Sequence, residues 1–236
     1  RALRGRYSPG STFKIAMAVA ALEEGIVTPD FRVPCGGGST FYGRFYRCHT
    51  PLGTVDRREA LEKSCNTYFY ALGEKLQIDE IHKWASALGL GGLTGVDLPH
   101  EVLSLMPSVA WKRERWDEPW YPGETISVAI GQGPVAVTPI SLAVMMATVA
   151  NGGTRVTPHL LKAVNEGGEF VPVARPVPKS RVALDPVTLD TVIEGLWDVV
   201  NRAGTGRRGR IPGRDVMGKT GTAQVISLQG RLAAGD

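Results

Sequence analysis

Apolar residues recur at helical spacing in the first patterned segment of the chain, residues 11–24. Three of them fall on one face of a helix: Ile15, Val19 and Leu22. A turn at Pro9 and Gly10 precedes the segment, and Gly25 follows it as a stop signal. The pattern therefore predicts a helix from Ser11 to Glu24.

Capping residues mark the other predicted helices. Asp56 and Glu59 form a capping-box pattern for a helix that runs into Ser64-Cys65-Asn66. Thr138 precedes Pro139, a favoured residue for the first helical position. Similar signals bound further helices over Thr67 to about Leu76, Asp79 (as the N-cap) to Leu88, Thr138 to Ala150, and Asp185 to Asn201.

The remaining segments lack helical spacing. Residues 27–55 are predicted to be irregular, with room for a short hairpin, and residues 91–124 are aperiodic. Leu160–Val164 and Phe170–Val173 flank a turn and predict a β-hairpin. In Val216–Ile226 threonine and valine alternate, which predicts a strand, and its glycines would let another backbone approach closely.

Length and composition indicate a globular protein and argue against a nucleic-acid-binding or membrane-spanning one. The 236 residues fit one large or two small domains, and 43% hydrophobic and 21% charged residues are ordinary for a globular protein. The net charge of +4 comes from scattered residues without a nucleic-acid motif, so nucleic acid is not an expected partner. No apolar run approaches the roughly 18 to 20 residues of a membrane helix, and no signal peptide is evident.

A hydroxyl and an amine stand together at the start of the first predicted helix. Ser11 and Lys14 are three residues apart, so they share a face of its first turn, where free backbone N–H groups favour negative charge. Lys14 could act as the base that activates Ser11, provided that burial beside another cation lowers its pKa. Alone, such a pair is more commonly a helix cap and a solvated charge.

Two further motifs change this interpretation: Ser64-Cys65-Asn66 and Lys219-Thr220-Gly221. Together with Ser11-Thr12-Phe13-Lys14 they form, in order, the set found in penicillin-binding proteins and class A β-lactamases. Over nearly its whole length the chain resembles the transpeptidase domain of class B penicillin-binding proteins, most closely the elongation-type penicillin-binding protein 2. The runs that carry this resemblance are residues 7–14, 64–70, 119–125, 131–133 and 219–224.

The resemblance implies a role for each motif residue. Ser11 would attack the carbonyl between two D-alanines of a peptidoglycan stem, Lys14 would take its proton, and Ser64 would relay a proton to the leaving group. Asn66 would hold Lys14 and the acyl side chain, and Lys219 would lower the pKa of Lys14 by like-charge repulsion. Thr220, Gly221 and Thr222 would form the carboxylate-binding segment, and the backbone N–H groups of Ser11 and Thr222 the oxyanion hole.

The same resemblance implies the fold and the setting. The expected fold is α/β (α+β), of the penicillin-binding and serine β-lactamase type, with an antiparallel sheet flanked by helices beside an all-helical lobe. Residues 1–236 would be one transpeptidase domain. The family's membrane anchor, pedestal, C-terminal strands and closing helix would lie outside this sequence, and the domain would sit on the periplasmic face of the cytoplasmic membrane.

The implied partners are those of cell-wall synthesis. They are peptidoglycan stem peptides, lipid-linked precursor strands and β-lactams, together with a membrane-embedded glycosyltransferase and cell-elongation proteins. Catalysis would require no cofactor. Two alternatives remain open: a hydrolase (D,D-carboxypeptidase or β-lactamase), which would need an additional base to activate water, and a non-catalytic β-lactam sensor.

The cysteines pose a separate question. Cys35, Cys48, His49 and Cys65 provide the ligand set of a Cys₃His zinc site, and some elongation-type members carry a zinc at the matching place. Adjacent Cys48 and His49 could both ligate only in an irregular loop, because neighbouring side chains in a strand point to opposite sides. The alternatives are a Cys35–Cys48 disulfide and three unligated buried thiols.

Overall fold

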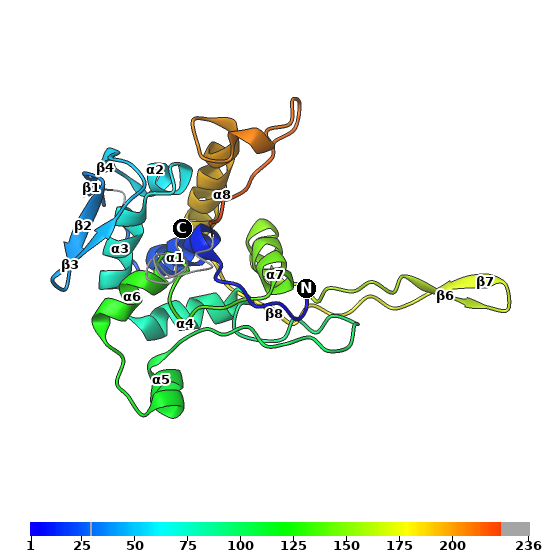
Figure 1. The fold of residues 1–236 in the computed structure, drawn as a ribbon. Helices are drawn as coiled ribbons and strands as arrows, with labels where there is room; N and C mark the ends of the chain where they lie inside the picture. The colour runs from blue at the N-terminus through cyan, green and yellow to red at the C-terminus, as the bar shows by residue number, and fades with distance from the viewer. Residues whose placement is uncertain (29, 223–236) are drawn as a thin grey trace, which may run out of the picture.

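A computed structural model describes residues 1–28 and 30–222. The helix α1 (Lys14–Glu23) lies at its centre, preceded by the 3₁₀ turn η1 (Gly10–Phe13) (Figure 1). It packs against α3 (Asn66–Lys75), α4 (Ile78–Ala87) and α8 (Pro186–Asn201). Alanines alternate with larger apolar residues, so α1 is buried on nearly every side, as expected for a helix that is apolar all round. The predicted helix is confirmed, but its first turn is 3₁₀.

The predicted capping box at Asp56 is confirmed. The Asp56 carboxylate accepts hydrogen bonds from the backbone N–H groups of Arg58 and Glu59 at the start of α2 (Arg57–Glu62). At the end of α2 the chain turns sharply through Ser64, which has a φ of 55°. Cys65 then caps α3 by accepting a hydrogen bond from the N–H of Tyr68.

The N-cap of α4 differs from the prediction. The cap is Gln77, two residues before Asp79, and it forms a capping box with Glu80. Asp79 lies in the first turn instead, and its carboxylate accepts a hydrogen bond from the N–H of Val109. Asp79 therefore links α4 to the next helix.

Residues 91–124 contain two helical segments that the pattern did not reveal, α5 (Val109–Trp116) and the start of α6 (Pro122–Val128). In α5 the buried residue is Lys112, 2% exposed, whose amine binds both carboxylate oxygens of Glu124 at 2.6 and 2.7 Å. A charged residue at the buried position hides the helical spacing.

All strands of the described part pair antiparallel in two-stranded sheets. In the segment predicted to be irregular, Val33 of β1 pairs with Val55 of β4, and Gly38 of β2 with Arg47 of β3. The predicted hairpin is confirmed with a tighter turn, because Glu166 pairs with Glu169. The strands are β1 (Val33–Cys35), β2 (Gly38–Phe41), β3 (Arg44–Arg47), β4 (Gly53–Val55), β5 (Thr154–Arg155), β6 (Ala163–Glu166), β7 (Glu169–Pro172) and β8 (Ser180–Arg181).

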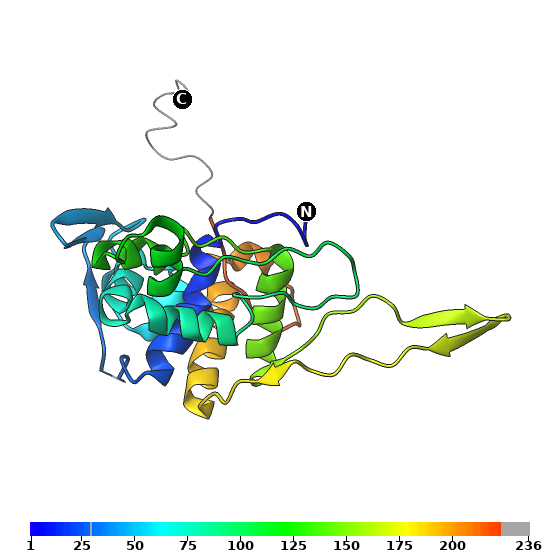
Figure 2. The same ribbon diagram turned by 90° about the horizontal axis from the view of Figure 1, so that it is seen from below.

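Two views show how these parts are arranged. β1 to β4 lie on one side of the helical body, and the β6–β7 hairpin projects from the opposite side as a narrow arm (Figure 1, Figure 2). The caps predicted for α7 (Pro139–Ala150) and α8 are confirmed: Thr138 accepts a hydrogen bond from Ser141 N–H and Asp185 from Val187 N–H. Within the described ranges, no helix has the length and apolar character needed to cross a bilayer.

The predicted strand over 216–226 is wrong for residues 216–222, which form no strand. Its remaining residues lie outside those that the structure describes. The segment is held from the side of α8, where Asn201 donates a hydrogen bond to the carbonyl of Val216 at 2.8 Å and Leu196 accepts one from Gly218 N–H. With these bonds in place, the segment that follows reaches the turn before α1, where Thr222 lies against Gly10.

Candidate active site

Lys14 is the centre of the site. Its side chain is fully buried, and its amine donates hydrogen bonds to Asn66 Oδ1 at 2.6 Å, to the carbonyl of Ser64 at 2.8 Å and to Ser64 Oγ at 3.2 Å. The amine also lies 5.3 Å from the centre of the Phe69 ring. The first two predicted motifs are therefore brought into direct contact across 50 residues of sequence.

Local backbone geometry makes this contact. Ser64 adopts a left-handed conformation that is uncommon for residues other than glycine, and it presents both its carbonyl and its hydroxyl to Lys14. Asn66 occupies the first position of α3, directly after this turn. Its Nδ2 donates to the carbonyl of Arg47 at 3.4 Å, which leaves Oδ1 directed at Lys14.

Ser11 lies in η1, one 3₁₀ turn before Lys14. Residues i and i+3 eclipse one another in a 3₁₀ helix, so Ser11 and Lys14 share a face more closely than in the α-helix that was predicted. Ser11 is partly exposed, whereas Phe13 and Lys14 are fully buried. The turn thus places a partly exposed serine three residues before a buried lysine.

Two glycines allow the third motif to approach this turn. Gly10 has a φ of 56°, and a Cβ at this position would collide with the carbonyl of Thr222. A Cβ on Gly131 would collide with the carbonyl of Gly10, whose N–H donates to Gly131 at 3.0 Å. Gln132 donates its side-chain N–H to the carbonyl of Thr222 at 3.3 Å. The backbone of residues 220–222 is therefore seated against the Ser11 turn.

Lys219 and Lys14 have lowered pKa values. Burial, followed by the positive charge of Lys219, lowers the pKa of Lys14 to about 7. Burial lowers the pKa of Lys219 to about 8. Lys219 lines an apolar cavity of about 190 Å³ between the Ser11 turn and α7, together with Thr12, Ile15 and Met145. Between these two pKa values Lys14 is neutral and Lys219 is charged, the condition needed for Lys14 to act as a base.

The three cysteines lie together directly behind Ser64 and Asn66. Their sulfur atoms are all within 4.8 Å of one another, and the Cys48 and Cys65 sulfurs are 3.9 Å apart. All three are free thiols, so the alternative of a Cys35–Cys48 disulfide is not found. His49 is exposed, and its ring nitrogens are not part of this group of ligand atoms.

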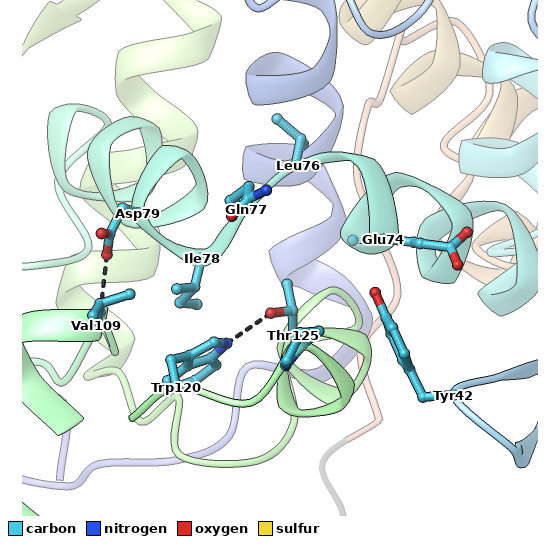
Figure 3. Close-up of a pocket in the computed structure, with 11 residues that line it drawn as sticks. Tyr42, Glu74, Leu76, Gln77, Ile78, Asp79, Val109, Trp120 and Thr125 are labelled. Carbon is cyan, nitrogen blue, oxygen red and sulfur yellow. Dashed lines mark hydrogen bonds between the residues drawn. The ribbon is translucent and has the colours of Figure 1, made fainter. Parts of the chain in front are cut away.

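The tryptophans of residues 91–124 do not line this site. Trp111 and Trp116 pack edge to face at 4.9 Å, and Trp120 lines a separate cavity of about 210 Å³ between α3, α4 and α6 (Figure 3). In Figure 3 the Trp120 indole points to the hydroxyl of Thr125, a hydrogen bond of 2.8 Å. None of the residues of the three motifs lines this cavity.

One polar contact to the third motif involves a residue that no sequence motif contains. The hydroxyl of Thr205, in the loop after α8, lies 2.7 Å from the hydroxyl of Thr220. No local pattern marks Thr205, because its role depends on two segments that meet only in the folded chain. The exposed arginines of the same loop make no comparable contact to the motifs in the described part.

Comparison with known proteins covers almost the whole chain. Residues 1–234 match the family described as penicillin binding protein transpeptidase domain. The peptidoglycan D,D-transpeptidase MrdA of Acinetobacter baumannii is 39% identical over 234 residues, which are 97% of this chain and 34% of that protein. The chain thus spans about a third of the length of the curated relatives it matches.

Solved structures agree with this match. The crystal structure of Pseudomonas aeruginosa PBP2 in complex with WCK 5153 has a TM-score of 0.86 and 41% identity, covering 95% of this chain and 52% of that one. PBP2 of Helicobacter pylori in complex with MreC has a TM-score of 0.81 and 28% identity, covering 93% and 40%. A peptidoglycan synthase complex that coordinates polymerization and crosslinking contains a chain with a TM-score of 0.84 and 40% identity, covering 98% and 39%.

Proposed function

This chain belongs to the penicillin-binding protein transpeptidase family, and we propose that it cross-links peptidoglycan stem peptides through an acyl-enzyme on Ser11. The predicted fold class is confirmed, with small antiparallel sheets flanked by helices. One observation supports the proposal most strongly. Ser64 and Asn66 accept hydrogen bonds from Lys14, the charge of Lys219 acts on the same amine, and Ser11 lies in the 3₁₀ turn directly before Lys14.

In the acylation step, Ser11 Oγ attacks the carbonyl between the two D-alanines of a donor stem, and neutral Lys14 accepts the hydroxyl proton. The charge on the tetrahedral oxygen is stabilised by the backbone N–H groups of Ser11 and Thr222, each worth roughly 3 kcal/mol by analogy with other oxyanion holes. Gly10 supports this arrangement because it lets Thr222 lie against the turn.

The leaving group then needs a proton. The hydrogen bond between Lys14 and Ser64 Oγ offers a route: Ser64 gives its proton to the departing D-alanine amine while the Lys14 ammonium replaces it. The C–N bond breaks and an ester to Ser11 remains. An amine of a neighbouring stem attacks this ester, its proton passes through Lys14 to Ser11 Oγ as the bond to that oxygen breaks, and a cross-link forms.

The setting of the whole protein is part of the proposal. Because MrdA of Acinetobacter baumannii is named a peptidoglycan D,D-transpeptidase, we assign this chain stem peptides and lipid-linked strands as substrates and β-lactams as inhibitors. The related PBP2 structures with MreC and in a peptidoglycan synthase complex support cell-elongation proteins and a membrane-embedded glycosyltransferase as partners. The domain would then work on the periplasmic face of the membrane.

Turnover of a stem-peptide donor by the full-length protein tests this function. With a D-Ala-D-Ala donor and an amine acceptor, the proposal expects release of D-alanine and a product that contains the acceptor. Release of D-alanine with no acceptor product would instead indicate a hydrolase. Stable acylation by penicillin without turnover of the donor would indicate a sensor. Ser8→Ala, in the same segment, is the matched control for Ser11→Ala.

We also propose that Cys35, Cys48 and Cys65 hold a structural zinc ion. The 3.9 Å separation of the Cys48 and Cys65 sulfurs is close to the ~3.8 Å edge of a tetrahedron with Zn–S bonds of about 2.3 Å. The group supplies three of four ligands, and His49 is the nearest candidate in sequence for the fourth. Zinc here would fix Cys65 and thereby the turn that holds Ser64 and Asn66.

Metal analysis of protein purified without chelator tests the zinc site. One zinc per chain and three titratable thiols after chelation are expected. Cys35→Ser should lose the metal, and His49→Ala shows whether the imidazole is a ligand. Absence of metal from freshly purified protein with three free thiols would contradict the proposal.

A further inference from the structure

The loop between α8 and the third motif contains a hydroxyl that faces the motif directly. Thr205 Oγ1 lies 2.7 Å from Thr220 Oγ1, and either hydroxyl could be the donor. Both threonines are exposed, so this is a contact at the surface of the site and not a buried core bond. Thr205 is absent from the three sequence motifs.

Thr205 is held in place from α2, the helix that leads into Ser64. Its backbone N–H donates to the carbonyl of Glu62 at 3.2 Å. The carboxylate of Glu62, a residue only 4% exposed, accepts a hydrogen bond from Ala203 N–H at 3.0 Å. Lys63 donates to the carbonyl of Ala203 at 2.7 Å. Glu62 and Lys63, at the end of α2, therefore fix the backbone of residues 203–205.

The end of α8 fixes the same loop from the other side. Gly206 N–H donates to the carbonyl of Val199 at 2.8 Å. Gly204 is buried, and a Cβ there would collide with the backbone of Val199. The loop thus packs closely on α8, and its hydrogen bonds to α2 and α8 fix the backbone that carries the Thr205 hydroxyl.

We propose that Thr205 is a positioning residue that orients the hydroxyl of Thr220 toward the carboxylate of the substrate. The inference rests on the proposed function, in which Thr220 binds that carboxylate. A carboxylate can only accept, so Thr220 must donate its proton to it. The Thr220 oxygen is then free to accept from Thr205, and the two hydroxyls form a chain in one direction. Because the Thr205 N–H bonds to the Glu62 carbonyl, these hydrogen bonds also connect the carboxylate-binding segment to α2, the helix before Ser64.

This arrangement predicts an effect that depends on the carboxylate. A single hydrogen bond of this kind corresponds to a change of about three- to tenfold in rate. The change should appear for ligands whose carboxylate binds Thr220, and it should vanish when either the carboxylate or the Thr220 hydroxyl is removed. A purely structural role of Thr205 would instead affect all ligands equally.

The test uses the full-length protein, benzylpenicillin and benzylpenicillin methyl ester, with second-order acylation rates as the readout. Thr205→Val keeps the shape of the side chain and removes the hydroxyl, whereas Thr205→Ser keeps the hydroxyl. We expect Thr205→Val to acylate about three- to tenfold more slowly with benzylpenicillin, Thr205→Ser to stay near the wild-type rate, and the ester to react equally with both. In a Thr220→Val background, Thr205→Val should have no further effect.

Three outcomes overturn the inference while leaving the proposed function intact. They are a wild-type rate for Thr205→Val with benzylpenicillin, an equal loss with the acid and the ester, and an undiminished loss in the Thr220→Val background. Thermal melting of each variant shows whether a loss of rate comes from unfolding, in which case Thr205 is structural and the inference fails. Absence of acylation in the wild-type protein would overturn the proposed function together with the inference.

Discussion

The amine of Lys14 lies 2.6 Å from the amide oxygen of Asn66, although the two residues are 52 positions apart in the sequence. The amide accepts a hydrogen bond without adding a negative charge. The buried amine is therefore held in place while its pKa stays low, near 7, because burial and Lys219 both disfavour its charged form.

Replacing Asn66 by Asp should raise the pKa of Lys14. A carboxylate within hydrogen-bond distance of the amine stabilises the ammonium form, by about one to three pH units. The rising limb of acylation against pH should move upward by that amount, because Lys14 must be neutral to accept the proton of Ser11. Stopped-flow acylation measured from pH 5 to 10 checks this. Asn165→Asp, on the distant hairpin, is the matched control, and an unshifted limb in Asn66→Asp would contradict the role of Lys14.

The wild-type protein should have a narrow pH optimum for acylation. The rate should rise as Lys14 loses its proton at about pH 7 and fall as Lys219 loses its proton at about pH 8. Lys219→Ala should acylate far more slowly but melt at nearly the same temperature, because among the described residues the Lys219 amine donates only to the carbonyl of the adjacent Thr220, at 3.3 Å. A variant that acylates at the wild-type rate, or that keeps the falling limb, would count against this assignment.

Gly10→Ala should abolish acylation much more than it destabilises the protein. The added Cβ would displace the carbonyl of Thr222 and with it the oxyanion donor. Gly25→Ala provides a close control, since Gly25 has a similar φ of 67° but open space around its Cα. Equal losses of acylation in the two variants would show that backbone strain, and not contact with Thr222, is responsible.

Arg58 should matter for stability and not for the reaction. Its guanidinium pairs with the fully buried carboxylate of Asp198 and, at 3.0 Å, with Glu194, which joins α2 to α8. Arg58 is itself partly exposed, so Arg58→Met should cost about 2 kcal/mol, less than a fully buried pair. Thermal or urea unfolding measures the loss. Arg57→Met on the same helix is the control, and equal stabilities of the two variants would rule out the proposed link.

Local signals in the sequence predicted a large part of the fold and of the site. Side-chain caps at Asp56, Thr138 and Asp185 act within a few residues, so they can be identified without the tertiary structure. The Ser11, Ser64 and Lys219 motifs could be matched to a family because each is short and they occur in a fixed order. The convergence of Ser64 and Asn66 on Lys14 then followed from the family resemblance.

Features that depend on tertiary contacts were missed or wrong. The buried position of α5 is a lysine that needs Glu124, so the helix lacked an apolar stripe. Residues 216–222 have the composition of a strand but pair with no neighbouring strand among the described residues. His49 lies outside the group that the three cysteine sulfurs form, which its place beside Cys48 in the sequence could not show. Thr205 acquires its role only where two distant segments meet.

The identity of the acylated residue is the most direct test of the role of Ser11. The full-length protein is treated with a fluorescent penicillin, its intact mass is measured, and the modified peptide is mapped by mass spectrometry. A single adduct on Ser11 is expected, which should be lost in Ser11→Ala and retained in Ser8→Ala. An adduct that persists in Ser11→Ala, or that maps to any other residue, would contradict the assignment of Ser11 as the nucleophile.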